Sequence, residues 1–172
     1  AFNGINDERK GFDLMLRALT NINIDKKKFI VVILGNADGL NKINELYKFN
    51  FEIFDQNFNN DKDLLKTIYS ACDILIMPSR LEAFGQVALE AGSCALPCVS
   101  FRNTGVEDVI NHNNDGYLAD YLNIESLTRG INLLNKESIH SKMSKNIREK
   151  IVKEFSYENI SKKYKDIYET LI

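Results

Sequence analysis

The chain has 172 residues, of which 44% are hydrophobic and 27% charged, and its formal net charge is −2. This length suits one domain with a substantial core, and the charge gives no electrostatic reason for bulk nucleic-acid binding. No apolar run approaches bilayer length and no signal peptide opens the sequence. We therefore expect a cytoplasmic protein. The start, AFNGIND, lacks a methionine, which indicates a piece of a longer chain.

The cysteines Cys72, Cys94 and Cys98 lie in apolar surroundings and are odd in number. This pattern favours buried thiols over a disulfide framework. Cys94 and Cys98 lack the second ligand pair of a zinc site, so we expect no metal.

Helical and strand patterns alternate along the chain. Apolar residues at helical spacing predict an amphipathic helix after Gly11, and FIVVILG, residues 29–35, predicts a strand buried on both faces. A short helix over 41–48 and a strand from Phe51 follow. The expected inward positions of the first helix are Phe12, Met15, Leu16, Leu19 and Ile22.

A further helix opens with Asp61 as its N-cap. The segments DILIMPS and PCVSF predict buried strands, and AFGQVALEAG between them predicts a helix ending at Gly92. After Asp120 the pattern is wholly helical, with Ser156 capping the last helix. Residues expected to face inward are Leu64, Leu65, Ile68 and Tyr69 in the helix after Asp61, and Tyr157, Ile160, Tyr164, Ile167 and Leu171 are expected to share one face of the last helix.

This alternation predicts an α/β fold: a Rossmann-like, doubly wound parallel sheet with extra C-terminal helices. Ligands of such sheets bind outside the carboxyl ends of the strands. The segment MPSRLEAFGQVALEAG lies there, with a helix expected to begin near Ala83 or Phe84. The free N–H groups from Phe84 through Val87 would form an anion site, and Gly85 would let a ligand approach the backbone.

Two glutamates, Glu82 and Glu90, flank this helix start. Eight helical positions span roughly 12 Å, whereas glycosidase carboxylates stand about 5–9.5 Å apart. A longer ligand fits better: two sugars around a diphosphate, as in a nucleotide-sugar. Glu82 could instead be an ordinary acid at a helix start, but Glu90 lies among apolar residues, where a buried acid needs a partner.

These residues resemble the glutamate-x7-glutamate signature of retaining GT-B glycosyltransferases of family 4, also called group 1. RKGFDLMLRAL, IYSACDILIMPS and NTGVEDVINHNNDGYLA resemble further segments of the C-terminal, donor-binding lobe of that family. The residues that carry the resemblance are Pro78, Ser79, Glu82, Phe84, Gly85, Glu90, Ala91, Gly92, Pro97 and Val99, with Gly105, Asp108 and Gly116 in the later segment.

The resemblance implies that Lys10 meets the donor diphosphate, Glu90 the ribose hydroxyls and Glu82 the transferred sugar. A cation and a helix terminus would then stabilise the leaving diphosphate without a metal. The family often has an arginine five residues before the lysine, where this chain has Ile5. Arg9 either substitutes for that arginine or points to solvent. Backbone donors would come from Phe84, Gly85, Gln86 and Val87.

The whole chain, 1–172, is thus expected to be the lobe that binds a UDP- or GDP-linked hexose, with the N-terminal acceptor lobe missing. The acceptor would be a glycan or a lipid-linked glycan, and the abundance of Lys, Asn and Ile favours a bacterial surface-polysaccharide pathway. Peripheral membrane association through the missing lobe stays open. The alternative is a non-catalytic nucleotide-binding or interaction module. A phosphoacceptor receiver domain is excluded, since AFNGI and FIVVILG lack its acids.

Overall fold

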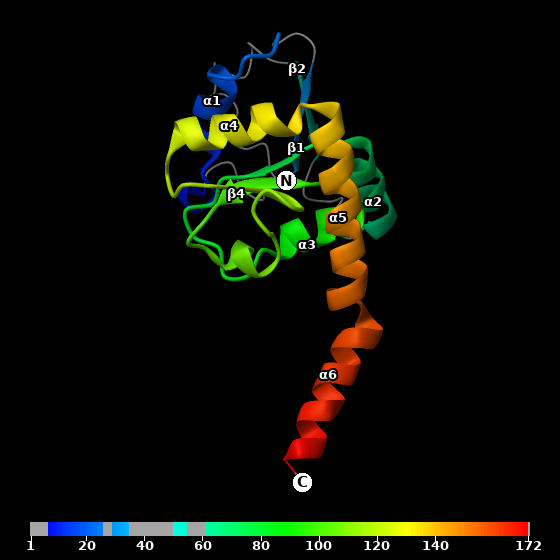
Figure 1. Ribbon diagram of the computed structural model, residues 1–172. Coiled ribbons are helices and arrows are strands. Elements are labelled where there is room, and N and C mark those ends of the chain that lie inside the picture. The colour runs from blue at the N-terminus through cyan, green and yellow to red at the C-terminus, as the bar shows by residue number, and fades with distance from the viewer. Residues whose placement is uncertain (1–6, 26–28, 35–49, 55–60, 172) are drawn as a thin grey trace.

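The computed structural model describes residues 7–25, 29–34, 50–54 and 61–171. Strands and helices alternate in these ranges, and only helices follow the last strand (Figure 1). The strands are β1 (Ile30–Leu34), β2 (Asn50–Phe54), β3 (Leu75–Met77), β4 (Cys98–Phe101) and β5 (Gly116–Ala119). The helices are α1 (Phe12–Thr20), α2 (Lys62–Ala71), α3 (Gln86–Ser93), α4 (Ile124–Leu134), α5 (Glu137–Phe155) and α6 (Tyr157–Thr170), with short 3-10 helices η1 (Glu8–Lys10) and η5 (Gly105–Asp108).

Every strand pair in the described residues is parallel. β1 pairs with β2, and β3, β4 and β5 form a sheet in that order with β4 in the centre. Cys98 of β4 lies opposite Leu75 on one side and Gly116 on the other. Because the strands are parallel, their carboxyl ends open at one edge of the sheet, where the loops to the following helices gather.

The sheet is covered on both faces, as β4 shows most clearly. All four β4 residues are buried, and successive side chains of a strand point to opposite faces. Val99 and Phe101 belong to the cluster that packs under α1 and α4, whereas Cys98 packs in the cluster with α2, α3 and α5. Figure 1 shows α1 and α4 above β4 and α3 below it, with α5 running past the side of the strands. The predicted doubly wound α/β architecture is therefore confirmed.

Several predicted elements agree with the structure. The helix after Gly11 buries its apolar stripe, and Ile22 is also buried although α1 has already ended. The Asp61 carboxylate caps α2 by accepting the Leu64 N–H at 2.9 Å. The helix that was predicted to end at Gly92 ends one residue later in the structure, at Ser93. The helix expected over 41–48 lies outside the described residues.

Three expectations were wrong. The side chain of Leu64, in the first turn of α2, was expected inward but is exposed, whereas Ile68 and Tyr69, further along the helix, are buried in the core. The short strand β5 was missed, since four residues after a polar turn give little periodicity. α3 begins at Gln86 instead of Ala83 or Phe84, because Gly85 adopts a left-handed conformation that a helix cannot continue through.

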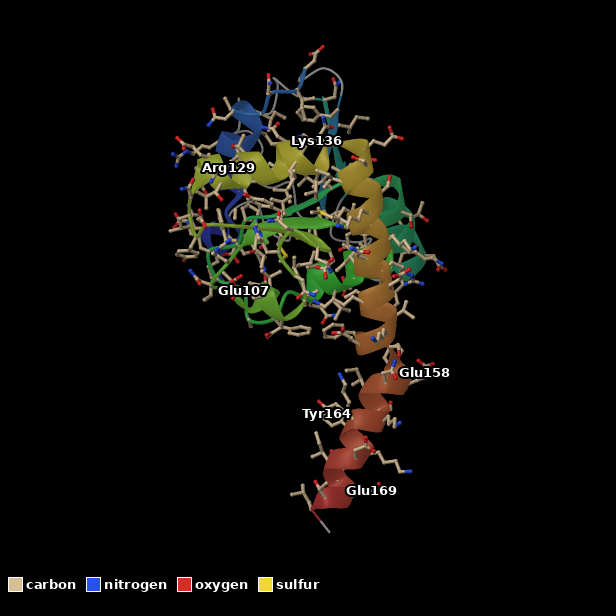
Figure 2. All side chains as sticks on the ribbon, viewed as in Figure 1. Glu107, Arg129, Lys136, Glu158, Tyr164 and Glu169 are labelled. Carbon is tan, nitrogen blue, oxygen red and sulfur yellow. The ribbon has the colours of Figure 1, made fainter. Side chains whose placement is uncertain are left out.

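The two C-terminal helices behave differently. α5 buries Met143, Ile147 and Ile151 against the body, whereas α6 projects away from it and buries none of its residues (Figure 1). Ser156 caps α6 as expected, but the predicted packed face is exposed within this chain. Figure 2 shows Glu158, Tyr164 and Glu169 along this projecting rod. Among the described helices, none is long and apolar enough to span a bilayer.

Candidate functional site

The turn between η1 and α1 brings Lys10 to the carboxyl end of β3. Asp7 caps η1, and Gly11 ends it with φ +70° while its N–H bonds to the Glu8 carbonyl. A Cβ on Gly11 would stand 2.0 Å from the carbonyl oxygen of Pro78. Only glycine therefore lets the two backbones meet this closely. Lys10, the last residue of η1, is placed beside the loop that follows β3.

Lys10 and Glu82 form an ion pair at this place. The ammonium Nζ of Lys10 donates to Oε2 of Glu82 at 3.5 Å. The Glu82 side chain is 15% exposed and that of Lys10 32% exposed. The two residues predicted to be catalytic are 72 positions apart in sequence, and the fold brings them together as a partly buried pair.

The loop 82–85 is fixed from its other side by η5. The Glu82 carbonyl accepts the Gly105 N–H at 2.8 Å, and a Cβ on Gly105 would stand 2.0 Å from the Ala83 carbonyl. Gly85, at φ +94°, lies against Val106, where a Cβ would be 3.1 Å from the valine side chain. The backbone beside Glu82 therefore has little freedom to move.

The N-terminus of α3 has no side-chain cap. The first N–H groups of any helix lack partners within the helix. Since α3 starts at Gln86, these groups belong to Gln86, Val87 and Ala88, whereas the sequence predicted them from Phe84 through Val87. Phe84 lies before the helix, and its ring packs against Phe155 of α5 with centroids 6.1 Å apart. The positive end of this helix still points toward an anion site.

Glu90 lies one turn further along α3. Its Oε1 accepts a hydrogen bond from Nε2 of Gln86 at 3.3 Å. The side chain is half-buried, not fully buried as its neighbours in sequence suggested. The pKa of Tyr69 on α2 is raised mainly by burial, and the nearby charge of Glu90 is the second cause. The carboxylate of Glu90 therefore lies between an apolar interior and solvent.

Arg9 does not join the pair of Lys10 and Glu82. Its guanidinium binds the Asp7 carboxylate from Nε at 3.0 Å and from Nη2 at 2.8 Å, and its side chain is 71% exposed. The hydrogen bond with Asp7 raises the pKa of Arg9. The sequence left open whether Arg9 substitutes for the missing arginine or points to solvent, and in the structure it points to solvent.

One residue of this region, Arg80, was treated from sequence only as part of a turn. Its guanidinium forms a two-bond pair with Asp13 of α1, at 2.8 and 2.7 Å, and a third bond to the Glu8 carbonyl. No local pattern connects Arg80 with Asp13, 67 residues away. The residue could have been noticed only as an arginine directly after a buried strand.

Histidine, cysteine and carboxylate side chains form no cluster of three or more within residues 7–25, 29–34, 50–54 and 61–171. The cysteines in this part of the chain are free thiols, and burial raises the pKa of Cys98 to about 12.

The fold is a Rossmann-like lobe in which the uncapped start of α3 follows the carboxyl end of β3. A crystal structure of Anabaena HepE in complex with UDP and glucose has the same fold. It matches with a TM-score of 0.76 over 98% of this chain and 47% of that one, at 16% identity. This fold is one lobe of a GT-B glycosyltransferase.

Sequence comparison assigns the family. Residues 3–153 match the family described as glycosyl transferases group 1, so the chain belongs to this family. Over 140 residues it is 31% identical to N-acetyl-alpha-D-glucosaminyl L-malate synthase of Bacillus anthracis. This matched region covers 80% of this chain and 36% of that protein. It is 29% identical over 145 residues to UDP-Gal:alpha-D-GlcNAc-diphosphoundecaprenol alpha-1,3-galactosyltransferase of Escherichia coli, covering 81% and 36%. The chain thus spans less than half the length of these relatives.

Proposed function

We propose that this lobe binds the nucleotide-sugar donor of a retaining glycosyltransferase that transfers a hexosyl group to a glycan or lipid-linked acceptor. The observation that supports this most directly is the pair of Lys10 and Glu82 beside the uncapped start of α3. A cation and free helix N–H groups suit a diphosphate, while Glu82 and Glu90 can accept hydrogen bonds from hydroxyls on either side of it.

In the proposed reaction the bond between the sugar's anomeric carbon and the diphosphate oxygen breaks, the acceptor hydroxyl oxygen takes its place on that carbon, and the hydroxyl proton passes to the departing diphosphate. Negative charge grows on the departing diphosphate. Lys10 and the N–H groups of Gln86 and Val87 stabilise this charge, which lowers the barrier. Glu82 binds the transferred sugar, and Glu90 binds the ribose. We propose that no metal takes part, so nucleotide binding should persist in the presence of a chelator.

The pair of Lys10 and Glu82 has a consequence for binding. Without ligand, each charge partly neutralises the other across 3.5 Å. A diphosphate would compete with Glu82 for the ammonium, which would free that carboxylate to accept a sugar hydroxyl. Loading the donor thus prepares the acid that contacts the transferred sugar.

We also propose that a second lobe completes the enzyme and supplies the acceptor site. The curated relatives are more than twice as long as their matched regions. α6 supports this proposal, because it carries several large apolar side chains that stay exposed in the described part of this chain. The exposed residues are Tyr157, Tyr164, Ile167, Tyr168 and Leu171. We propose a pathway of glycan assembly, with UDP or GDP as the nucleotide. The name of the Escherichia coli relative, which contains UDP-Gal and a diphosphoundecaprenol-linked sugar, supports the pathway and UDP.

Calorimetry with UDP and with GDP tests the donor site. We expect one of these nucleotides to bind the wild-type chain, and Glu90→Ala to weaken its binding about tenfold or more, as expected when a charged hydrogen-bond acceptor is lost. Glu149→Ala, an exposed mid-helix glutamate of α5, is the matched control and should bind as wild type. Equal affinity of wild type and Glu90→Ala would refute the site.

A further inference from the structure

Arg80 joins two segments that are far apart in sequence and both contribute to the site. Its Nη1 and Nη2 bind the Asp13 carboxylate, and Nη1 also donates to the Glu8 carbonyl at 2.6 Å. Its backbone N–H donates to the Arg9 carbonyl at 2.7 Å. The contacts to Glu8, Arg9 and Asp13 surround Lys10 on both sides in sequence, although Arg80 does not touch Lys10 itself.

Arg80 is itself held in place. The hydroxyl of Tyr121, in the turn after β5, donates to the Arg80 carbonyl at 2.9 Å. Two residues further along the chain, the Glu82 carbonyl accepts the Gly105 N–H. The backbone from Arg80 to Glu82 is therefore anchored to the sheet region, and it forms a fixed base against which η1 can be aligned.

We propose that Arg80 is a positioning residue that holds η1 in the register that places Lys10 beside Glu82 and the donor diphosphate. This inference rests on the proposed function for the identity of the ligand, but the placement of Lys10 can be tested without any ligand. The residue acts through Lys10 and needs no contact with the nucleotide.

The chemistry of arginine suits this task. A guanidinium is a planar fork that can bind a carboxylate through two nitrogens while a further N–H reaches a carbonyl. A lysine ammonium lacks this fixed geometry. The hydrogen bond with Arg80 also lowers the pKa of Asp13, because the guanidinium stabilises the charged carboxylate. A surface ion pair alone contributes little to stability, but this one also fixes the direction of a backbone segment.

Arg102 offers a matched control. Its side chain is 41% exposed and pairs with Asp120, 55% exposed, and it donates to the Leu118 carbonyl. The corresponding values for Arg80 and Asp13 are 33% and 57%. The two arginines thus have similar exposure, but the hydrogen-bond and ion-pair partners of Arg102 lie in and directly after β5, not in η1 or α1.

The first measurement is the side-chain NMR signal of Lys10, assigned with Lys10→Met. In wild type it should differ from that of a solvated lysine, and Glu82→Gln should move it to the solvated value. We expect Arg80→Gln to move it in the same direction, Arg80→Lys to restore it only in part, and Arg102→Gln to leave it unchanged. An unchanged Lys10 signal in a folded Arg80→Gln variant would overturn the inference, whatever the nucleotide results are.

The second measurement is a double-mutant cycle of UDP and GDP affinity. Arg80→Gln should weaken binding about tenfold, equivalent to about 1.4 kcal/mol, and should cause no further loss in a Lys10→Met background. Additive losses would mean that Arg80 acts independently of Lys10, which contradicts the proposal. If the NMR shift occurs but neither nucleotide binds wild type, the positioning role stands and the proposed function fails.

Discussion

At the residue scale, the site depends on close approaches that only glycine permits. Gly11 lies against the Pro78 carbonyl and Gly105 against the Ala83 carbonyl. Both contacts bring a loop up to the backbone next to Glu82. The arrangement explains why the segment around the ion pair combines charged residues with glycines: side chains there would push the charged groups apart.

We expect Gly11→Ala to lower the free energy of unfolding by about 2 kcal/mol or more. The new Cβ meets the Pro78 carbonyl and also disfavours φ +70°. Urea unfolding measures the effect. Gly11→Asn separates the two causes, since asparagine tolerates positive φ but still carries a Cβ. Full stability of Gly11→Asn would show that the backbone angle, and not the contact with Pro78, imposes glycine.

At the scale of elements, α5 is joined to the turn before β5 by a buried charge pair. Asp115 is fully buried, and the Lys150 ammonium lies 3.8 Å from it with its side chain 11% exposed. Lys150 also donates to the Val109 carbonyl at 2.7 Å, and Asp115 accepts the Asn111 N–H. This connection holds α5, and with it Phe155 against Phe84, close to the start of α3.

We expect Lys150→Met to lower the free energy of unfolding by about 3 kcal/mol at neutral pH, because it leaves the buried carboxylate without its cation. Burial already raises the pKa of Asp115, and Lys150 opposes that rise. The folded state therefore binds the Asp115 proton more tightly than the unfolded state. The contribution of Asp115 to the free energy of unfolding consequently falls as the pH rises above the ordinary pKa of an aspartate. The loss in Lys150→Met should accordingly be smaller at pH 4 than at pH 7.

The control for this prediction is Lys145→Met, because Lys145 pairs with Glu149 on the exposed face of the same helix. That variant should stay within about 0.5 kcal/mol of wild type at both pH values. Urea unfolding at the two pH values is the measurement. An equal loss for Lys150→Met at pH 4 and pH 7 would mean that Asp115 does not cause it.

At the scale of the whole molecule, α6 is distinct from the body of the lobe. The described core lies on the two faces of the sheet, and α6 adds no buried residue to it. Its tyrosines and several of its aliphatic residues are exposed, and Figure 2 shows Tyr164 on the projecting helix. The body should therefore fold without α6, whereas the complete enzyme should depend on it.

Ending the chain after Ser156 should change the free energy of unfolding of the lobe by less than about 1 kcal/mol, since no fully buried residue of α6 is lost. Ile151→Ala, in the buried face of α5, is the comparison and should cost about 2–4 kcal/mol. Urea unfolding of both variants beside wild type is the measurement. A loss in the shortened chain as large as that of Ile151→Ala would show that α6 stabilises the lobe itself.

The sequence by itself determined the alternation of strands and helices up to β4, the caps at Asp61 and Ser156, and the residues of the family signature, because these depend on neighbours a few positions apart. Only the tertiary structure decided which charges meet. Lys10 reaches Glu82 through a contact between backbones 67 residues apart, Gly11 against Pro78, and Arg9 turns to Asp7 instead. The start of α3 and the role of Arg80 were decided in the same way, because positive φ at Gly85 and the bonds to Glu8 and Asp13 arise from packing between distant segments.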